Sequence, residues 1–412
     1  MLTLNRTGNT EPWKRDLYIL WICSFVLQLG FSLIMPFLPL YLEELNVHGP
    51  AVELWSGVIF SANFIVMAIF SPIWGGLSDR IGRKPMMLRS AFGMGLVVWL
   101  MGLVTSAPQL LGLRLLQGIA SGFIPAANAY VAGIVPRERS GQALGILGTG
   151  ATAGMILGPL VGGALSRWVG YRPIFFLTSI SCLITGVVVL LTIREKVTPV
   201  ARKKGDGLVG DFRLVAQYPV ILAMMVVLFM NTFSMLTAEP ILARFLQTLN
   251  APAAWVSFLS GVVFSMTGVS NLLVAPVSGR LSDRFGSKRL LVVCLAGASL
   301  LYVVQGLATA TWQMIVLRCL LGIFTGGLMP AVSSLIVRTA PRELQGRIFG
   351  MTSSAIFLGN TVGPLVGGVL AANFGVRAVF PVTGALLLLD LAWVAFGVRE
   401  KPIHSEETAS GA

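Results

Sequence analysis

The chain alternates between long apolar segments and short polar ones. Apolar runs of roughly 20 residues, the length that crosses a bilayer as a helix, lie near 17–42, 54–76, 86–105, 109–132, 143–165 and 173–193. After a polar connector, six more lie near 218–246, 255–277, 290–309, 313–337, 347–371 and 378–398. The first run is too long for a cleaved signal peptide. The pattern predicts twelve transmembrane helices.

Composition agrees with a lipid environment. Hydrophobic residues make up 55% of the chain and charged residues only 11%, whereas a soluble domain carries about a quarter charged residues. The four cysteines all lie inside apolar runs, and His48 and His404 are far apart, so neither a disulfide framework nor a metal site is expected. We expect an all-α membrane protein and no soluble enzyme.

The net charge of +13 has two interpretations, a nucleic-acid surface or a topology signal. With a cytoplasmic N-terminus, 24 of the 30 lysines and arginines fall in predicted inside segments. Four fall in predicted outside loops, Arg167, Arg172, Arg244 and Arg377, and two fall within spans, Arg114 and Arg318. This bias is the positive-inside pattern. It argues against nucleic-acid binding and predicts that both termini are cytoplasmic.

The two halves of the sequence repeat each other. SPIWGGLSDRIGRK from Ser71 aligns with APVSGRLSDRFGSK from Ala275 at an offset of 204, and GPLVGG occurs at both Gly158 and Gly363. The repeat predicts two pseudo-symmetric six-helix bundles, residues 1–196 and 217–412, joined by a cytoplasmic connector, 197–216. Such repeats enclose a central cavity, and rocking of one against the other alternates its access.

The polar loop after the second run carries the first specific motif, GGLSDRIGRK. It resembles the loop 2–3 motif of the major facilitator superfamily, which implies a twelve-helix fold in which this loop is a conformational latch. The latch residues are Gly75, Asp79, Arg80, Gly82, Arg83 and Lys84, with Asp283 and Arg284 in the second copy. Asp79 can bind a helix N-terminus or a loop arginine. The alternative is a basic loop that serves topology only. Because Ser287 replaces Arg83 in the second copy, we expect a weaker latch there.

The fifth run carries glycines four residues apart, which allow close helix approach on one face. This motif comprises Gly150, Gly154, Gly158, Pro159, Gly162 and Gly163, and it resembles the antiporter motif of exporters in the superfamily. The alternative is plain helix packing, because the eleventh run repeats part of the pattern. Gly30, Pro36, Pro39 and the segment from Leu113 to Gly118 match further motifs. The whole chain resembles the twelve-span drug:proton antiporter-1 family, which implies proton-coupled export.

Four charged residues stand inside predicted spans, where each costs about 2.5–3.5 kcal/mol on insertion scales. They are the proton-coupling candidates Glu239, Arg114, Arg318 and Asp390. The resemblance implies that Arg114 tunes a nearby carboxylate or polar network, whereas a structural role is the alternative. Glu239 is a candidate on its chemistry, because a carboxyl group shielded from water binds a proton more readily. Its alternative is an ion pair with Arg244.

The spans that line the cavity in this superfamily supply aromatic, methionine and amide side chains. They are Phe31, Met35, Phe123, Asn128, Asn231, Phe233, Met235 and Met329. Such surfaces adapt to varied apolar ligands, and an acid in the cavity favours lipophilic cations. Packing between helices is the alternative for each residue.

These observations together predict a monomeric, proton-driven multidrug exporter in the plasma membrane, the inner membrane of a bacterium with two membranes. We expect no cofactor besides the coupling proton and no metal, and the absence of a P-loop pattern argues against ATP as the energy source. An exporter of one physiological compound, such as a siderophore, a lipid or a sugar, is the alternative within transport. A membrane sensor with a transporter fold is the alternative outside it.

Overall fold

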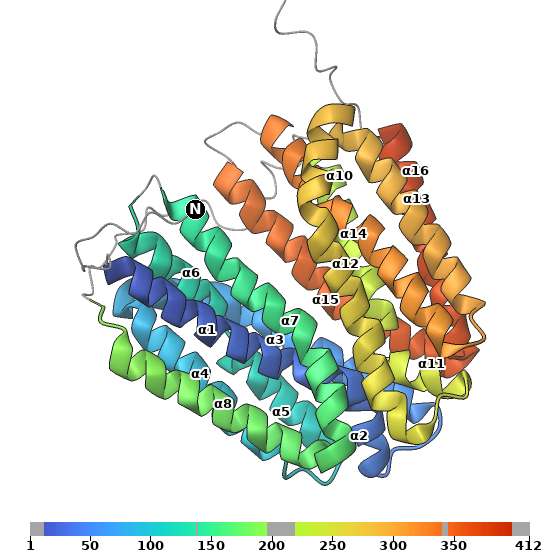
Figure 1. Cartoon of the computed structure of the whole chain (residues 1–412), viewed down its shortest axis with the longest axis horizontal. Helices are drawn as coiled ribbons and strands as arrows, with labels where there is room; N and C mark the ends of the chain where they lie inside the picture. Colours follow the sequence, from blue (N-terminus) through green and yellow to red (C-terminus); the bar gives the residue numbers. More distant parts are fainter. Residues whose placement is uncertain (1–11, 137–138, 196–218, 340–344, 398–412) are drawn as a thin grey trace, which may run out of the picture. The chain divides into compact units, whose positions relative to one another are not determined.

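A computed structural model of the chain describes residues 12–136, 139–195, 219–339 and 345–397, and the regular elements in these ranges are helices (Figure 1). The first half contains α1 (Pro12–Leu33), η1 (Met35–Phe37), α2 (Leu38–Glu44), α3 (Ala51–Ile81), α4 (Arg83–Met101), α5 (Ala107–Ala120), α6 (Phe123–Ile134), α7 (Ser140–Val169) and α8 (Tyr171–Thr192). The second half contains α10 (Pro219–Ala238), α11 (Leu242–Thr248), η3 (Ala253–Trp255), α12 (Val256–Phe285), α13 (Ser287–Gly306), α14 (Thr311–Thr339), α15 (Gln345–Phe374), η5 (Val376–Ala378) and α16 (Val379–Gly397).

The predicted all-helical membrane fold is confirmed. Within the described ranges, eleven helical segments are long and apolar enough to cross a membrane. The remaining predicted span corresponds to α4, which carries Arg83, Lys84 and Arg89 in its first two turns. Those charges lower the mean hydropathy of α4, although its 19 residues are enough to cross the hydrocarbon core of a bilayer.

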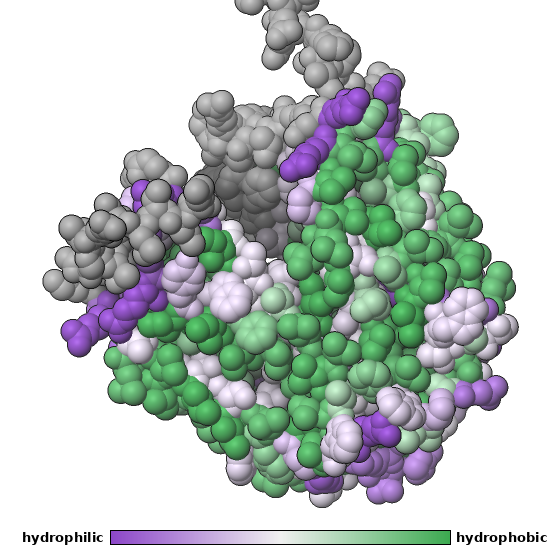
Figure 2. Space-filling model, viewed as in Figure 1, coloured by the Kyte–Doolittle hydropathy of each residue, from purple (hydrophilic) through white to green (hydrophobic). Residues whose placement is uncertain are grey.

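The helices expose apolar side chains in a way that only lipid can accommodate. On the face in Figure 2, the helix surfaces of the second unit are mostly hydrophobic, and hydrophilic side chains gather near the helix ends. Large apolar side chains that are more than half exposed include Leu273, Val293, Leu300, Phe374 and Phe396. Because a soluble protein seldom exposes apolar patches of this extent, these surfaces are expected to contact acyl chains.

The chain forms two compact units that differ from a simple division into halves. The first comprises residues 1–35 and 66–202, and the second comprises 36–65 and 203–412. The segment 36–65 therefore packs with the second unit, although the sequence repeat assigns it to the first six helices. The predicted connector, 197–216, lies outside the described residues.

Three predicted spans are broken rather than continuous. The first run divides into α1 and α2 around Pro36, and the seventh divides into α10 and α11 around Pro240. Proline lacks the backbone N–H that a helix interior needs and clashes with the preceding turn. The fourth run breaks at Gly122, whose φ of 122° is available to glycine at little cost.

Each unit contains an equivalent hydrogen bond between two of its own helices. In the first unit Lys84 Nζ on α4 donates to the Leu190 carbonyl on α8 at 2.8 Å. In the second, Lys288 Nζ on α13 donates to the Ala395 carbonyl at the end of α16, also at 2.8 Å. The sequence repeat thus extends to individual hydrogen bonds.

A second repeated contact lies at the opposite ends of these helices. Arg172 donates to the Val104 carbonyl at 2.9 Å, and Arg377 donates to the Ala308 carbonyl at 3.1 Å. These carbonyls follow the C-terminal ends of α4 and α13, where helical carbonyls lack intrahelical partners and a cation is favourable.

Candidate functional site

A buried polar cluster in the second unit contains two of the predicted coupling residues. Glu239 lies in the break between α10 and α11 and is 5% exposed, and Arg318 on α14 is 1% exposed. Glu239 and Arg318 lie within range of each other's charge, and the Tyr302 hydroxyl on α13 lies within range of both. The helix break therefore brings an acid, a guanidinium and a phenol into one buried neighbourhood.

Several buried polar atoms in and near this cluster have no hydrogen-bond partner in the described part of the chain. The Tyr302 hydroxyl donates to the Ser234 carbonyl at 3.0 Å. Nε and Nη2 of Arg318, and both side-chain polar atoms of Gln305 one helical turn beyond Tyr302, have no hydrogen-bond partner in the described part of the chain. Buried polar atoms are rarely left without partners. Such atoms can bind a proton-carrying water or a polar group of a ligand.

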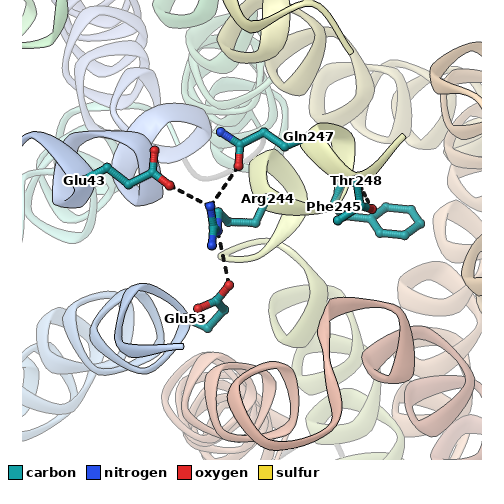
Figure 3. Close-up of polar contacts among 6 residues, drawn as sticks. All are labelled: Glu43, Glu53, Arg244, Phe245, Gln247 and Thr248. Atoms are coloured by element: carbon teal, nitrogen blue, oxygen red, sulfur yellow. Dashed lines mark hydrogen bonds and ion pairs between the residues drawn. The ribbon is translucent and has the colours of Figure 1, made fainter. Parts of the chain in front are cut away.

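The alternative interpretation of Glu239, an ion pair with Arg244, is not what the structure contains. Arg244 Nη1 donates to Glu43 at 2.7 Å and Arg244 Nε donates to Glu53 at 3.2 Å (Figure 3). A third hydrogen bond joins Arg244 Nη1 to Gln247 at 3.1 Å. Arg244 is thus occupied by two other carboxylates. The charge that acts on Glu239 is that of Arg318.

Asp390 occupies a buried position on α16. It is 2% exposed, and neither carboxyl oxygen has a hydrogen-bond partner within the described ranges. A charged carboxylate in such surroundings is unfavourable because nothing replaces its hydration. Asp390 therefore has the burial that a proton-binding carboxyl requires, and among the described residues no cation plays the part that Arg318 plays beside Glu239.

Arg114 in the first unit has a simpler environment. It lies on α5, is 6% exposed, and its Nη1 donates to Gln117 Oε1 at 3.1 Å. Gln117 is fully buried, and Arg114 Nε lacks a partner in the described residues. The neighbour that Arg114 orients in this structure is an amide.

The predicted latch loop forms the tight junction between α3 and α4. Gly82 joins the two helices with a φ of 102°, a conformation that favours glycine. The carboxylate of Glu195 accepts hydrogen bonds from the backbone N–H groups of Arg83 at 2.9 Å and Lys84 at 2.6 Å. An acid at a helix N-terminus satisfies free N–H groups and opposes the helix dipole. Glu195 is a residue that sequence reasoning missed.

Other members of the latch are less fully defined. Gly75, Arg80 and Arg284 are exposed, and a Cβ at Gly75 would meet no neighbouring atom. The side chains of Asp79 and Asp283 lie outside what the structure describes. The contact predicted for Asp79 therefore stays a prediction.

The glycine motif of the fifth run lies against α1. A Cβ at Gly150 would lie 2.7 Å from the Trp21 carbonyl oxygen, and one at Gly154 would lie 2.8 Å from the Leu29 backbone nitrogen. The contact continues to Ser32 and Leu33 through Gly158 and Gly162, and Pro159 and Gly163 are buried on the same helix. Four of the glycines thus allow α7 and α1 to meet backbone to backbone.

The second unit repeats this packing between α15 and α10. A Cβ at Gly359 or Gly363 would lie 2.7 Å from the carbonyl oxygen of Phe229 or Phe233 respectively. Because both units use glycines in this way, close packing accounts for the spacing in both. An antiporter role of the first copy is an additional property that these contacts do not test.

The predicted cavity residues divide between the units. Phe123 is 4% exposed within the core of the first unit, and Phe31 packs against that core. Phe233 is 5% exposed and stacks on Phe229 with ring centroids 5.7 Å apart. The others are Met35, buried; Asn128, Asn231 and Met235, half-buried; and Met329, 48% exposed. Phe123 and Phe233 therefore contribute to helix packing.

Arg89 has a structural role that the charge count did not reveal. Its guanidinium lies 3.9 Å from the centroid of the Trp74 ring and donates to the Ile119 carbonyl at 2.8 Å and the Ser121 carbonyl at 2.6 Å. These carbonyls end α5, just before the break at Gly122. Arg89 compensates for the hydrogen bonds that the break removes.

Comparison with known proteins now identifies the family. The chain matches the Major Facilitator Superfamily over residues 20–272 and again over 224–411. It is 42% identical over 393 residues to a protein named Multidrug resistance protein MdtG from Escherichia fergusonii, covering 95% of this chain and 96% of that protein. A protein of the same name from Enterobacter lignolyticus is also 42% identical, over 388 residues, covering 94% of this chain and 93% of that protein.

Solved transporter structures share the fold at low sequence identity. A bacterial homologue of the human lysosomal transporter Spinster, in an inward-facing and unoccupied conformation, has a TM-score of 0.78 at 16% identity, covering 94% of this chain and 97% of that one. The D-xylose–proton symporter has a TM-score of 0.75 at 16% identity, covering 94% and 98%. The predicted resemblance is confirmed: the chain belongs to the Major Facilitator Superfamily and is a membrane transporter, not an enzyme.

Proposed function

We propose that this transporter exports several chemically different drugs in exchange for protons. The support for drug export is the 42% identity, over 95% of the chain, to a relative named for multidrug resistance. We further propose that it acts as a monomer in the plasma membrane with both termini in the cytoplasm, as the positive-inside bias predicts. Its substrates are expected to be lipophilic and often cationic.

The observation that carries proton coupling is the position of Glu239. This acid is buried where α10 is interrupted, and its charge interacts with that of Arg318. Interrupted helices near the middle of transporters commonly form substrate and ion sites. A buried carboxyl next to an arginine can alternate between a protonated state and an ion-paired state as water enters or leaves. Glu239 is therefore the proposed proton carrier, and Arg318 the group that releases its proton.

The test is drug transport in proteoliposomes with an imposed pH gradient. Driven by the pH gradient, wild-type protein is expected to move drug against the concentration gradient of the drug. Glu239→Gln, which cannot bind and release a proton, is expected to lose this coupled movement. The same variant should keep drug exchange without a gradient, because exchange needs binding and alternation only. Gradient-driven transport at the wild-type rate in Glu239→Gln would show that Glu239 does not carry the proton.

Asp390→Asn is the matched comparison, because it also neutralises one buried carboxyl of the second unit. If Asp390→Asn abolishes coupling and Glu239→Gln does not, the proton carrier is Asp390. Breadth of substrates is tested separately, by comparing resistance of cells with and without the protein to unrelated drugs. Protection against a single compound would favour the alternative of a specialised exporter.

A further inference from the structure

A groove of about 280 Å³ opens in the second unit between the end of α13 and the start of α14, two helices that pack side by side (Figure 1). Its apolar lining residues are Val304, Leu307, Ala308, Trp312, Val316 and Leu317. Leu307 is 73% exposed and Trp312 64% exposed, so the groove is open to the surroundings of the helices. Because α13 and α14 are both long and apolar enough to cross a membrane, those surroundings are lipid.

The polar residue of the lining, Gln313, is turned towards its own backbone. Its Oε1 accepts hydrogen bonds from the N–H groups of Thr309 at 2.7 Å and Ala310 at 3.2 Å. A ligand in the groove therefore meets mainly hydrocarbon. The volume lies below the range of about 300–1,000 Å³ that is usual for small-molecule pockets, and an open apolar channel of this size suits one alkyl chain.

A cation stands beside the groove. Arg377 Nη1 donates to the carbonyl of the lining residue Ala308 at 3.1 Å, and the guanidinium carbon lies 5.6 Å from the centroid of the Phe245 ring. These contacts hold the guanidinium in position, although Arg377 is exposed. No carboxylate pairs with Arg377 in the described part of the chain, and residues 306–313 and 374–378 include no Asp or Glu. The guanidinium therefore has N–H groups available for an anion, and phosphate is an anion that its geometry matches.

The groove lies at the ends of its two spans, where lipid headgroups meet the acyl chains. Trp312 is in the first turn of α14, and tryptophan is favoured at this depth because its ring is apolar and its N–H polar. Arg377 belongs to a loop between spans. The cation is thus at headgroup level, and the apolar groove leads from it towards the hydrocarbon core.

Comparison of the repeats shows that the fold does not require this groove. Arg377 corresponds to Arg172 at the offset of 205, and both donate to a carbonyl that follows a helix end. At the offset of 204, however, Trp312 corresponds to Pro108 and Val316 to Gly112. The arginine is shared architecture, whereas these two walls of the groove belong to the second unit.

We propose that the groove binds one phospholipid, with an acyl chain against Trp312 and Val316 and its phosphate on Arg377. This inference does not depend on which compounds the transporter moves. An anionic phospholipid is expected to bind more tightly than a zwitterionic one of the same chains, because an ammonium group offsets part of the attraction between phosphate and guanidinium.

The first experiment tests the phosphate contact by native mass spectrometry of the full chain in detergent. One equivalent of dioleoylphosphatidylglycerol is expected to bind wild-type protein more tightly than the rest. Arg377→Gln should weaken this binding roughly tenfold, the effect of one lost hydrogen bond between charged groups. Arg172→Gln is the matched control, because it loses the same charge and the equivalent carbonyl contact of the first unit. Equal weakening in both variants would show that lipid responds only to overall charge and would overturn the site.

The second experiment tests the groove itself. Val316→Trp should fill it and abolish the tight binding, while leaving Arg377 in place. The control is Val293→Trp, at a valine of α13 that is 57% exposed and does not line the groove. Bound lipid stabilises the folded state, so phosphatidylglycerol should raise the unfolding temperature of wild type and Val293→Trp but not of Val316→Trp. An equal rise in all three proteins would overturn the proposal, and this test holds even if Arg377→Gln folds poorly.

Two fragments of the lipid separate the contributions of its parts. Dioleoylglycerol, which lacks the phosphate, should bind wild type and Arg377→Gln equally and weakly. Glycerol phosphate, which lacks the chains, should not displace the phospholipid at equal concentration. Displacement by glycerol phosphate would show a simple anion site, and preference for a lipophilic cation such as tetraphenylphosphonium would show a drug site. Either result would overturn the assignment to phospholipid.

Discussion

The Ser179 hydroxyl on α8 donates a hydrogen bond of 2.6 Å to the Gly95 carbonyl on α4. In the second unit the equivalent contact runs in the opposite direction, because Ser299 on α13 donates to the Gly384 carbonyl on α16 at 2.7 Å. At the repeat offsets of 204 and 205, Gly95 corresponds to Ser299 and Ser179 to Gly384. The serine and the glycine have therefore exchanged helices between the two units, and the hydrogen bond between the helices is kept.

This exchange predicts an unusual double-mutant result. Gly95→Ser alone should destabilise the protein, because its Cβ would lie 2.7 Å from Leu183 Cδ2. Ser179→Gly alone should cost about 1 kcal/mol for the lost hydrogen bond. The double variant should recover part of the sum, because it recreates the arrangement of the second unit. Thermal unfolding in detergent measures the coupling, and strict additivity of the two effects would contradict the prediction.

Glu195 is predicted to stabilise the start of α4. Glu195→Ala removes the acceptor for two backbone N–H groups and should lower stability by about 1–2 kcal/mol, the range measured for N-terminal caps. Glu44→Gln, at an exposed acid, is the control for loss of one negative charge. A chemical denaturation series on the purified protein compares them. Equal stability of Glu195→Ala and wild type would show that the N–H groups find other partners.

Asp79→Asn is predicted to insert correctly and to transport slowly. The substitution keeps the size of the side chain but removes the charge that the latch hypothesis requires. Protein amount in the membrane and drug transport per molecule are measured together. Wild-type transport per molecule would refute the latch, and loss of the protein from the membrane would indicate a role in folding.

Gly154→Val is predicted to separate α7 from α1. Its Cβ would lie 2.8 Å from the Leu29 backbone nitrogen, whereas a Cβ at Gly148 would meet nothing within 4 Å. Overpacking typically costs about 1–3 kcal/mol, so Gly154→Val should unfold at lower temperature than Gly148→Val on the same helix. The two substitutions have the same effect on helix propensity. A lower unfolding temperature for Gly148→Val would place the contact on a different face.

The positions of the spans and the division into two repeats could largely be predicted from the sequence. The apolar runs located the spans, because a bilayer sets a similar minimum length for every spanning helix. The sequence repeat predicted two similar bundles, whereas the equivalent contacts of Lys84 and Lys288 are a finding of the structure. Glu239 and Arg318 were recognisable as site candidates because charge inside a span is costly. Their proximity was not, since it depends on how α10 and α14 approach each other.

Other features depend on contacts between residues far apart in the sequence, and these contacts produce no periodic pattern of apolar and polar residues. The cap by Glu195 joins residues more than one hundred positions apart. The two carboxylate partners of Arg244 come from a segment that the repeat assigns to the other bundle. Pro36 marked a disturbance in the first run, but proline alone does not distinguish a kink from an interruption. The packing of residues 36–65 with the second unit follows from side-chain contacts and not from hydropathy.

The four arginines predicted to face the exterior share one property. Arg172 and Arg377 bind carbonyls at helix ends, Arg244 binds two carboxylates, and Arg167 lies over the Trp168 ring. Each guanidinium is thus matched by a carboxylate, a helix dipole or a ring face, so its field into the surrounding water is reduced. On the predicted outer side, a positively charged solute would therefore meet less electrostatic repulsion from these four arginines than their formal charge implies.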